Sequence, residues 1–264
     1  MGNCTPITGS PYAGMDEVDE SEKDKNGVPL RDYSGKISRA ELKKRAKTGA
    51  FVFCSGDSEF SKIIKAFTKT AYTHVAVIIK KGTRVFVLQA VFMTRVPYYD
   101  YLTKRFKKSG VMLNTLDDFL DEDQGKVYYK ELDIGDKVIN PIAQLNFLRF
   151  VKNKKYELNP VVLMSAPSRA NFFPDRTAYF CSEVVYDFLY HMGLINKKKS
   201  TKNPQNIIPS DFVYINEQRQ FTLNTWVKYK DMVKVKKDSN VRDTSSRLLS
   251  AKFQLQEDSD DEYI

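Results

Sequence analysis

Residues able to carry covalent chemistry are scarce, because the 264-residue chain contains only two histidines and three cysteines. Cys181 opens a stretch in which Val184, Val185, Phe188 and Leu189 recur at three- and four-residue steps, the pattern of an amphipathic helix. At the start of a helix, unpaired N–H groups and the helix dipole favour an anion. Since the thiolate is the nucleophilic form of cysteine, this position predicts a reactive Cys181 thiol with a lowered pKa.

His74 precedes a β-branched run at residues 75–79 that predicts a buried strand, and residues 84–91 predict its hairpin partner through a short turn. Gln89 is then a polar side chain inside an apolar strand. Because buried polar groups need hydrogen-bond partners, we expect the Gln89 amide to face the imidazole and orient it, the role of asparagine in papain-like proteases. The three residues would form a Cys181–His74–Gln89 triad with His74 as general base.

Each of these residues also has a purely structural interpretation. Cys181 could be a small core side chain, His74 a hydrogen-bonded residue before a strand, and Gln89 a polar residue at a sheet edge. Taken singly, the structural interpretation is the commoner one, whereas the three residues together favour catalysis. The remaining candidate thiol, Cys54, falls within a predicted strand and is expected to be a core residue.

A set of short motifs follows a fixed order along the chain. They are Lys47-Thr48-Gly49, Phe60-Ser61, Tyr72-Thr73-His74-Val75, Leu116-Asp117-Asp118-Phe119, Lys155-Tyr156-Glu157, Phe180-Cys181-Ser182-Glu183 and Ile208-Pro209-Ser210-Asp211-Phe212. This order resembles the circularly permuted, YiiX-type branch of the NlpC-like papain-fold superfamily, to which lecithin:retinol acyltransferases are more distantly related. The resemblance covers about residues 38 to 215 and depends on the ordered set more than on any single motif.

The resemblance implies Cys181 as nucleophile, His74 as base, and Gln89 at the position where relatives often carry glutamate. The glutamine removes a negative charge that would favour the imidazolium. Ala50 replaces the usual aspartate of the first motif, and Ala76 replaces the usual glycine after the histidine. Neither of these two alanines removes a reacting group, but both indicate that substrate contacts differ from those of relatives.

The expected fold class is α+β: a circularly permuted papain-like fold in which a small antiparallel sheet packs on the cysteine-bearing helix. We expect one domain at residues 37–236, between disordered acidic segments at 1–36 and 237–264. The expected elements are helices at 38–47, 58–68 and 141–152, a strand at 51–54, the hairpin, a flap at 94–124, a strand at 127–132, and strand-like pieces at 207–215 and 221–235. In the helix at 141–152, Ile142 is expected to share the buried face.

Charge and chain ends suggest where the protein acts. Two acidic stretches, 16–24 and 257–264, contribute −5 each to the net charge of +9, so the rest of the chain carries +19. Such a body is attracted to anionic surfaces; an anionic membrane is favoured over nucleic acid, because no groove-reading motif is present. Gly2 and Cys4 weakly resemble a dual acylation site, although an ordinary flexible start is the alternative. We expect a cytoplasmic protein, peripheral on membranes if acylated.

Further features narrow the function. No apolar run is long enough for a transmembrane helix, no secretory signal is evident, and three scattered cysteines argue against a disulfide framework. No zinc-ligand spacing is present, and no cofactor is expected. We therefore expect a cysteine hydrolase or acyltransferase that acts on a lipid or peptide-like amide or ester through a Cys181 thioester. The alternative is a catalytically weak scaffold of the same fold that binds membranes or protein partners.

Overall fold

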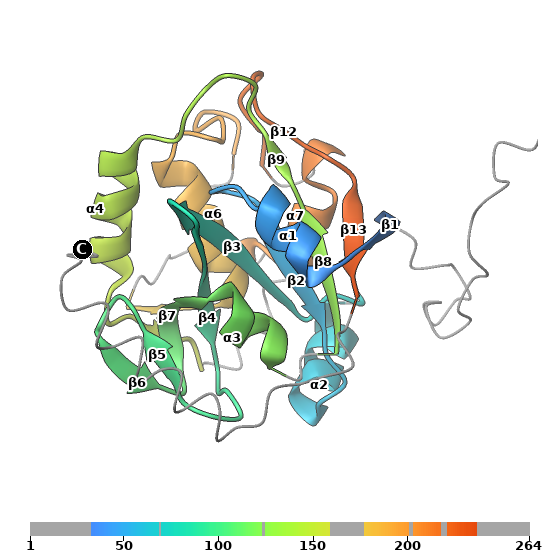
Figure 1. The fold of residues 1–264 in the computed structure, drawn as a ribbon, viewed down its shortest axis with the longest axis vertical. Helices are drawn as coiled ribbons and strands as arrows, with labels where there is room; N and C mark the ends of the chain where they lie inside the picture. Colours follow the sequence, from blue (N-terminus) through green and yellow to red (C-terminus); the bar gives the residue numbers. More distant parts are fainter. Residues whose placement is uncertain are drawn as a thin grey trace, which may run out of the picture. The chain divides into compact units, whose positions relative to one another are not determined.

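A seven-stranded sheet forms the centre of the described structure (Figure 1). The computed structural model describes residues 33–68, 70–122, 125–158, 177–200, 203–217 and 221–236. In spatial order the strands are β1 (Tyr33–Ile37), β13 (Met232–Val235), β8 (Lys126–Lys130), β2 (Phe51–Ser55), β3 (His74–Lys81), β4 (Arg84–Val91) and β7 (Gly110–Thr115). Neighbouring strands are antiparallel, except for β1 and β13, which run parallel.

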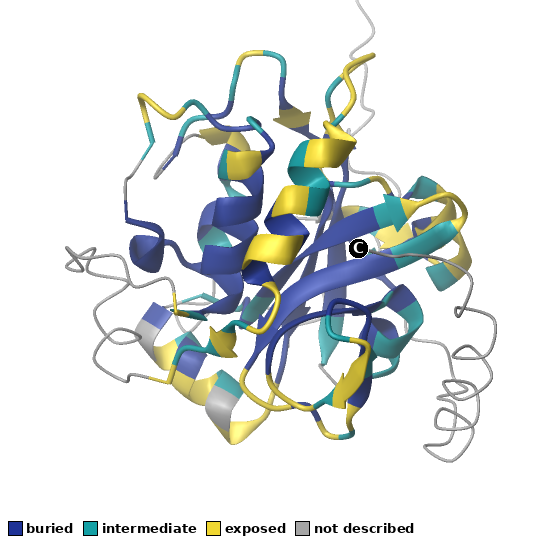
Figure 2. Ribbon diagram, turned by 90° about the vertical axis from the view of Figure 1, so that its left-hand side faces the viewer, coloured by how far each residue is buried: buried dark blue, intermediate teal, exposed yellow. Residues whose placement is uncertain are grey.

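The middle strands of this sheet are buried on both faces (Figure 2). All of β2 and residues 75–79 of β3 are buried, which is why these strands are continuous apolar runs in the sequence. The hairpin that joins β3 to β4 turns at Gly82, whose φ of 57° is a left-handed conformation that glycine adopts without steric cost. The hairpin places His74 at one end of β3 and Lys81 at the other.

Helices cover both faces of the sheet (Figure 1). One face carries α1 (Arg39–Arg45) and α3 (Leu116–Asp121), and the other carries α4 (Pro141–Val151), α6 (Cys181–His191) and α7 (Pro209–Val213). On the first face the Tyr129 hydroxyl donates to the Arg45 carbonyl at 3.0 Å. On the second, Phe51 of β2 contacts Phe212 of α7 with ring centroids 5.4 Å apart. Helix α6 packs on β3 and β4 and beside α4.

Shorter elements complete the body. They are α2 (Glu59–Thr68), the hairpin of β5 (Tyr98–Asp100) and β6 (Arg105–Lys107), the pair β9 (Leu132–Asp133) and β12 (Lys228–Tyr229), the pair β10 (Lys155–Tyr156) and β11 (Ala178–Tyr179), and the 3-10 turns η3 (Pro204–Asn206) and η4 (Ile215–Glu217). Among the described helices, none combines the length and the apolar character needed to cross a membrane.

The α+β fold class predicted from the sequence is confirmed, including the sheet packed on the cysteine-bearing helix. The helices expected at 38–47, 58–68 and 141–152 occur within two residues of those bounds. The sheet is larger than expected because β1 and β13 extend it beyond β8. Strand β1 also moves the start of the folded body to Tyr33, four residues before the expected boundary.

The expected flap at residues 94–124 is wrong. Within that stretch, residues 110–115 form β7, an edge strand of the main sheet whose register with β4 spans six residue pairs. Helix α3 follows directly, and its Leu116 and Phe119 are buried. Strand β7 and helix α3 therefore belong to the sheet and the core, and the hairpin of β5 and β6 precedes them in the sequence.

Two further local predictions are wrong. Ile142 of α4 is 69% exposed, because the helix buries Phe147, Leu148 and Val151 instead. Most of residues 207–215 is helical rather than extended. Pro209 occupies the first turn of α7, where its missing N–H is no loss. The expected acidic segments, with the candidate acylation residues Gly2 and Cys4, lie outside the described residues apart from the part of the first that forms β1.

Candidate active site

His74 is the first residue of β3 and lies directly opposite Cys54 of β2. Side chains alternate between the two faces of a strand, so His74 shares the face that α1 and α3 cover. Its ring stacks near Phe119 of α3, with centroids 6.2 Å apart and an interplanar angle of 29°. The imidazole is thus held against a helix while remaining partly exposed at the end of the strand.

A chain of hydrogen bonds runs from the imidazole across two neighbouring strands. His74 Nε2 lies 2.9 Å from Gln89 Oε1 on β4, and Gln89 Nε2 donates to Asn114 Oδ1 on β7 at 2.8 Å. Asn114 Nδ2 in turn donates to the carbonyl of Thr115 at 3.2 Å. Both amide side chains are buried, at 1% and 0% exposure. Buried amides in such a chain have little freedom to turn.

These hydrogen bonds determine which ring nitrogen of neutral His74 carries the proton. The Thr115 carbonyl can only accept, so the Asn114 amide must direct its nitrogen there and its oxygen towards Gln89. Gln89 must then present its own oxygen to the ring, which makes His74 Nε2 the donor. The other ring nitrogen, Nδ1, is left unprotonated. In its neutral form His74 therefore carries a base at Nδ1.

Asn114 is a residue of this arrangement that the sequence analysis missed. It is a polar side chain inside the buried run of β7, the same kind of signal that identified Gln89 on β4. Pairing of β4 with β7 places Asn114 opposite Val87, one step along the same face from Gln89. That step depends on strand register, which the sequence did not provide.

Cys181 begins α6 and is 6% exposed. Backbone N–H groups of Val75, Ser182 and Cys181 itself lie close enough to its sulfur to lower the pKa of the thiol. The contact with Val75 follows from the sheet. Backbone N–H groups along a strand point alternately to the neighbouring strands on its two sides. The N–H of Ile78 donates to the Ala50 carbonyl at 2.8 Å, so the even-numbered residues of β3 bond to the β2 side. The N–H groups of the odd-numbered residues therefore point towards β4.

The ladder between β3 and β4 begins only at Val77. The N–H of Val75 therefore points beyond the paired region, towards the sulfur of Cys181. This brings the thiol to the residue that follows His74. The two side chains nevertheless approach the end of β3 from opposite faces of the sheet, and no hydrogen bond joins the Cys181 sulfur to the His74 ring, both of which belong to the described residues.

Burial dominates the protonation of both groups. It lowers the pKa of His74 to about 4, against a smaller opposite effect of the Gln89 hydrogen bond. It raises the pKa of Cys181 to about 11, although the three backbone N–H groups lower it. Our expectation of a lowered Cys181 pKa is therefore wrong: the helix start acts in the expected direction, but desolvation of the thiolate outweighs it. Near neutral pH the structure holds a neutral thiol and a neutral imidazole.

A cavity of about 250 Å³ lies beside His74. Its wall includes the apolar side chains of Ile64, Val91, Phe92 and Met93, the hydroxyl-bearing residues Ser58, Ser61, Thr73, Thr94 and Tyr156, the carboxylates of Asp57 and Glu122, and also Cys54 and Gly56. Two of the apolar residues at its mouth are open to solvent, Phe92 at 39% and Met93 at 66%. Cys54, expected to be only a core residue, is buried but also borders this cavity.

Tyr156 connects the cavity to the cysteine helix. Its ring contacts Phe92 at the mouth and Phe180 before Cys181, with centroid distances of 6.1 and 5.9 Å. Burial raises the pKa of its hydroxyl well above the usual value, and the nearby Cys181 and Glu183 add to that rise. Aromatic contacts thus continue from Phe92 in the cavity wall through Tyr156 to Phe180, the residue before the thiol.

Comparisons with known proteins give a match to a family model and a match to a solved structure. A family model, that of the permuted papain-like amidases of the YaeF/YiiX type (C92 family), matches residues 45–235. Among solved structures, a match is the crystal structure titled metalloprotein yiiX from Escherichia coli O157:H7, with 16% identity and a TM-score of 0.41 over 74% of this chain and 98% of that chain. No curated protein shows significant similarity. In the ranges that the structure describes, no group of three or more His, Cys, Asp or Glu side chains could hold a metal ion.

Proposed function

Because this chain belongs to the permuted papain-like amidase family of the YaeF/YiiX type, we propose that it cleaves an amide or ester bond through a thioester on Cys181. The observation that carries this proposal is the hydrogen-bond chain from Thr115 through Asn114 and Gln89 to His74. It leaves Nδ1 as a base on a ring whose orientation is held. This is the task that a Cys-His pair needs its third residue to perform.

In the proposed reaction, His74 Nδ1 takes the thiol proton as the Cys181 sulfur attacks the carbonyl carbon of the substrate. Backbone N–H groups at the start of α6 stabilise the resulting oxyanion. The imidazolium then protonates the leaving amine or alcohol, which departs as the thioester forms. Water that loses a proton to Nδ1 hydrolyses the thioester and restores the thiol. An alcohol or amine in place of water would make the same enzyme a transferase.

Neutral resting groups are compatible with this sequence of steps. The proton moves from sulfur to nitrogen only as the sulfur attacks, so no thiolate needs to accumulate beforehand. Catalytic hydrogen bonds are often long in the absence of substrate and tighten in the complex. The contact between the Cys181 sulfur and His74 Nδ1 would then form at the end of β3, where the ladder with β4 has already ended.

The apolar cavity mouth supports a substrate with an apolar acyl group. Phe92 and Met93 expose carbon surface beside His74, and Tyr156 extends that surface to the start of α6. Burial of an acyl chain there is favourable by roughly 25 cal/mol per Å² of apolar surface. We therefore propose lipid amides or esters ahead of polar peptides as substrates.

A second candidate is the binding scaffold of the same fold. It is favoured by the missing hydrogen bond between thiol and imidazole and by the raised pKa of Cys181. The two candidates differ in whether an acyl-enzyme forms at all. The proposal of an enzyme requires one, on Cys181 and dependent on His74.

The experiment uses p-nitrophenyl butyrate and p-nitrophenyl dodecanoate with the full-length chain. Release of p-nitrophenol is followed together with the intact mass of the protein and the site of the acyl group by peptide mapping. If the protein is an enzyme, we expect one acyl group on Cys181 and no acylation of Cys181→Ala. Acylation of His74→Gln should be at least tenfold slower than that of the unchanged protein.

His191→Gln is the matched control, because the other histidine binds the Asp187 carbonyl at 2.8 Å and lies away from the site. It should acylate at the rate of the unchanged protein. If Cys181 acquires no acyl group, or acquires it equally fast in His74→Gln, the scaffold is the better description.

A further inference from the structure

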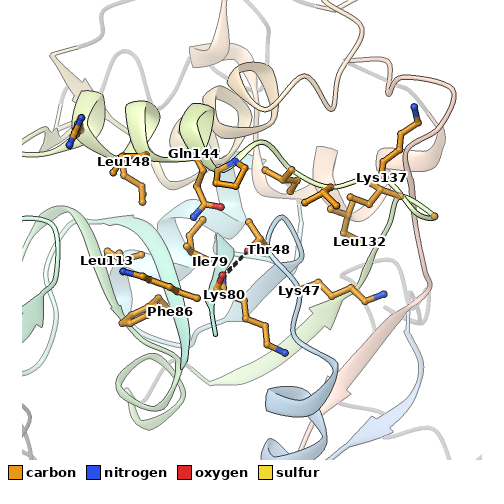
Figure 3. A pocket seen from close by; sticks show the side chains of 18 residues that line it. Lys47, Thr48, Ile79, Lys80, Phe86, Leu113, Leu132, Lys137, Gln144 and Leu148 are labelled. Atoms are coloured by element: carbon orange, nitrogen blue, oxygen red, sulfur yellow. Dashed lines mark hydrogen bonds between the residues drawn. The ribbon is translucent and has the colours of Figure 1, made fainter. Parts of the chain in front are cut away.

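A second cavity lies on the α4 side of the sheet, at the far end of β3 from His74 (Figure 3). We call it the α4 pocket. It encloses about 720 Å³ and includes Ile79, Lys80 and Lys81 of β3. At about 3.3 Å per residue along a strand, these residues lie roughly 17–23 Å from His74. The α4 pocket is therefore separate from the candidate active site.

The floor of the α4 pocket is apolar. Helix α4, strands β3, β4, β7 and β9, and the segment before α4 supply it, with Ile79, Phe86, Leu113, Leu132, Leu145 and Leu148 among its residues. The Gln144 amide points into this space, as Figure 3 shows. Thr48 lies at the margin, where its hydroxyl is already bonded to the Lys80 backbone N–H at 2.9 Å. A cavity of this size and lining is typical of small-molecule sites.

Only positive charges line the α4 pocket. Five residues with cationic side chains are among its lining residues, and none with a carboxylate: Lys47, Lys80, Lys81, Lys137 and Arg149. In Figure 3 the side chains of Lys47, Lys80 and Lys137 extend from the rim away from the apolar centre. An apolar floor with a cationic rim matches a molecule with an apolar body and an anionic head.

The rim charges are only partly neutralised by the protein. Lys47 pairs with Glu131 at 3.2 Å, but Glu131 also binds Lys230 and Arg45. Lys137 lies 5.0 Å over the ring of Trp226, a contact that leaves its charge available. Within the described residues, ion pairs involve neither Lys80 nor Arg149. The exposed Arg149 side chain can thus contact an anion without losing an ion pair within the protein, whereas Lys80 alternates with Ile79 along β3 and directs its side chain towards the other face.

We infer that the α4 pocket binds an amphipathic anion, an alkyl chain that lies on the apolar floor with one carboxylate or phosphate head at the cationic rim. Burial of the chain supplies the affinity, and the rim selects the sign of the head group. The absence of a lining carboxylate means that an equally apolar cation would meet only repulsion. This ligand is distinct from the substrate proposed at Cys181, since the two cavities share no lining residue.

The test measures binding of dodecanoate, dodecyl phosphate and dodecyltrimethylammonium to the full-length chain by calorimetry, below the concentration at which each forms micelles. Both anions should bind at one site per chain, and the preferred head group separates a free acid from a phosphate ester. The cation should bind at least tenfold more weakly. Protein alkylated with iodoacetamide at Cys181 should bind the anions unchanged, because the α4 pocket does not need the thiol.

Variants locate the site. Gln144→Trp fills the centre of the pocket and should weaken the binding of dodecanoate at least tenfold. Arg149→Glu replaces attraction of the head group at the rim by repulsion, and it should weaken the binding of dodecanoate about threefold to tenfold. The effect should be smaller at high salt, because salt screens exposed charges. Lys108→Glu is the matched charge reversal at an exposed position outside the pocket and should change nothing. Thermal unfolding of each variant shows whether it is folded.

Three results would overturn the inference: equal binding of the cation, loss of binding when Cys181 is alkylated, or unchanged binding in both folded pocket variants. Loss on alkylation would assign the alkyl chain to the active site instead. None of these results bears on whether Cys181 forms an acyl-enzyme, so the inference and the proposed function can fail separately.

Discussion

The replacement of Gln89 by glutamate tests the hydrogen-bond chain most directly. The His74 pKa of about 4 lies well below the ordinary 6.5, which corresponds to roughly 3 kcal/mol against the imidazolium. Gln89→Glu would place a carboxylate about where Oε1 now lies, 2.9 Å from Nε2. An opposite charge at such a distance raises a pKa by about 1–3 units, so His74 should titrate between roughly 5 and 7 in the variant.

The same replacement affects stability through Asn114. Glutamate has no donor for Asn114 Oδ1, so the Asn114 amide must turn, and the Thr115 carbonyl then loses its bond. One unsatisfied buried group costs about 1–3 kcal/mol. The variant should remain folded with a lower melting temperature. Adding Asn114→Asp to the Gln89→Glu variant would place a second carboxylate beside the introduced one and should not restore stability.

The assay is the titration of the two histidines by NMR, which the His191→Gln variant assigns, together with the pH dependence of acylation. Because the base must be unprotonated, the acid limb of acylation should follow the His74 pKa. The midpoint of this limb should lie near pH 4 in the unchanged protein, and it should shift to higher pH in Gln89→Glu. A His74 pKa near 6.5 in the unchanged protein, or one that Gln89→Glu leaves in place, would refute the reasoning.

The other predictions concern protons, packing and location. Because the folded-state pKa of His74 is depressed, its contribution to stability is complete above about pH 6.5 and is lost as pH falls towards 4, by at most about 3 kcal/mol in urea unfolding. Alkylation of Cys181 by iodoacetamide should rise with pH well beyond neutrality and exceed that of Cys54, whose pKa burial also raises; a plateau near pH 7 would contradict the raised pKa. Asn114→Leu should lower acylation about tenfold or more with little change in substrate KM, and an unchanged rate would remove it from the site. Full-length protein without acyl groups should cosediment with anionic vesicles at low salt and lose them at high salt, and indifference to vesicles would end the membrane proposal.

Much of the fold was readable from local patterns in the sequence. The run after His74 and the run at residues 84–91 are apolar because both strands are buried on both faces, and only strands in the middle of a sheet need that. The helix after Cys181 follows from its apolar spacing. Polar Gln89 inside a buried strand indicated a partner without saying which atom it would bind. These features depend on residues close in sequence, so a local pattern is enough to reveal them.

Tertiary structure alone decided the partners and the protonation states. Asn114 meets Gln89 because β4 and β7 pair in one register, and a shift by one residue would turn it to the other face. Ile142 was assigned to the core because helical spacing gives a face but not which neighbour that face meets. The pKa of Cys181 was misjudged for the same reason. Its position in the sequence sets the N–H groups at the helix start, whereas the desolvation that outweighs them depends on how closely distant strands cover the sulfur.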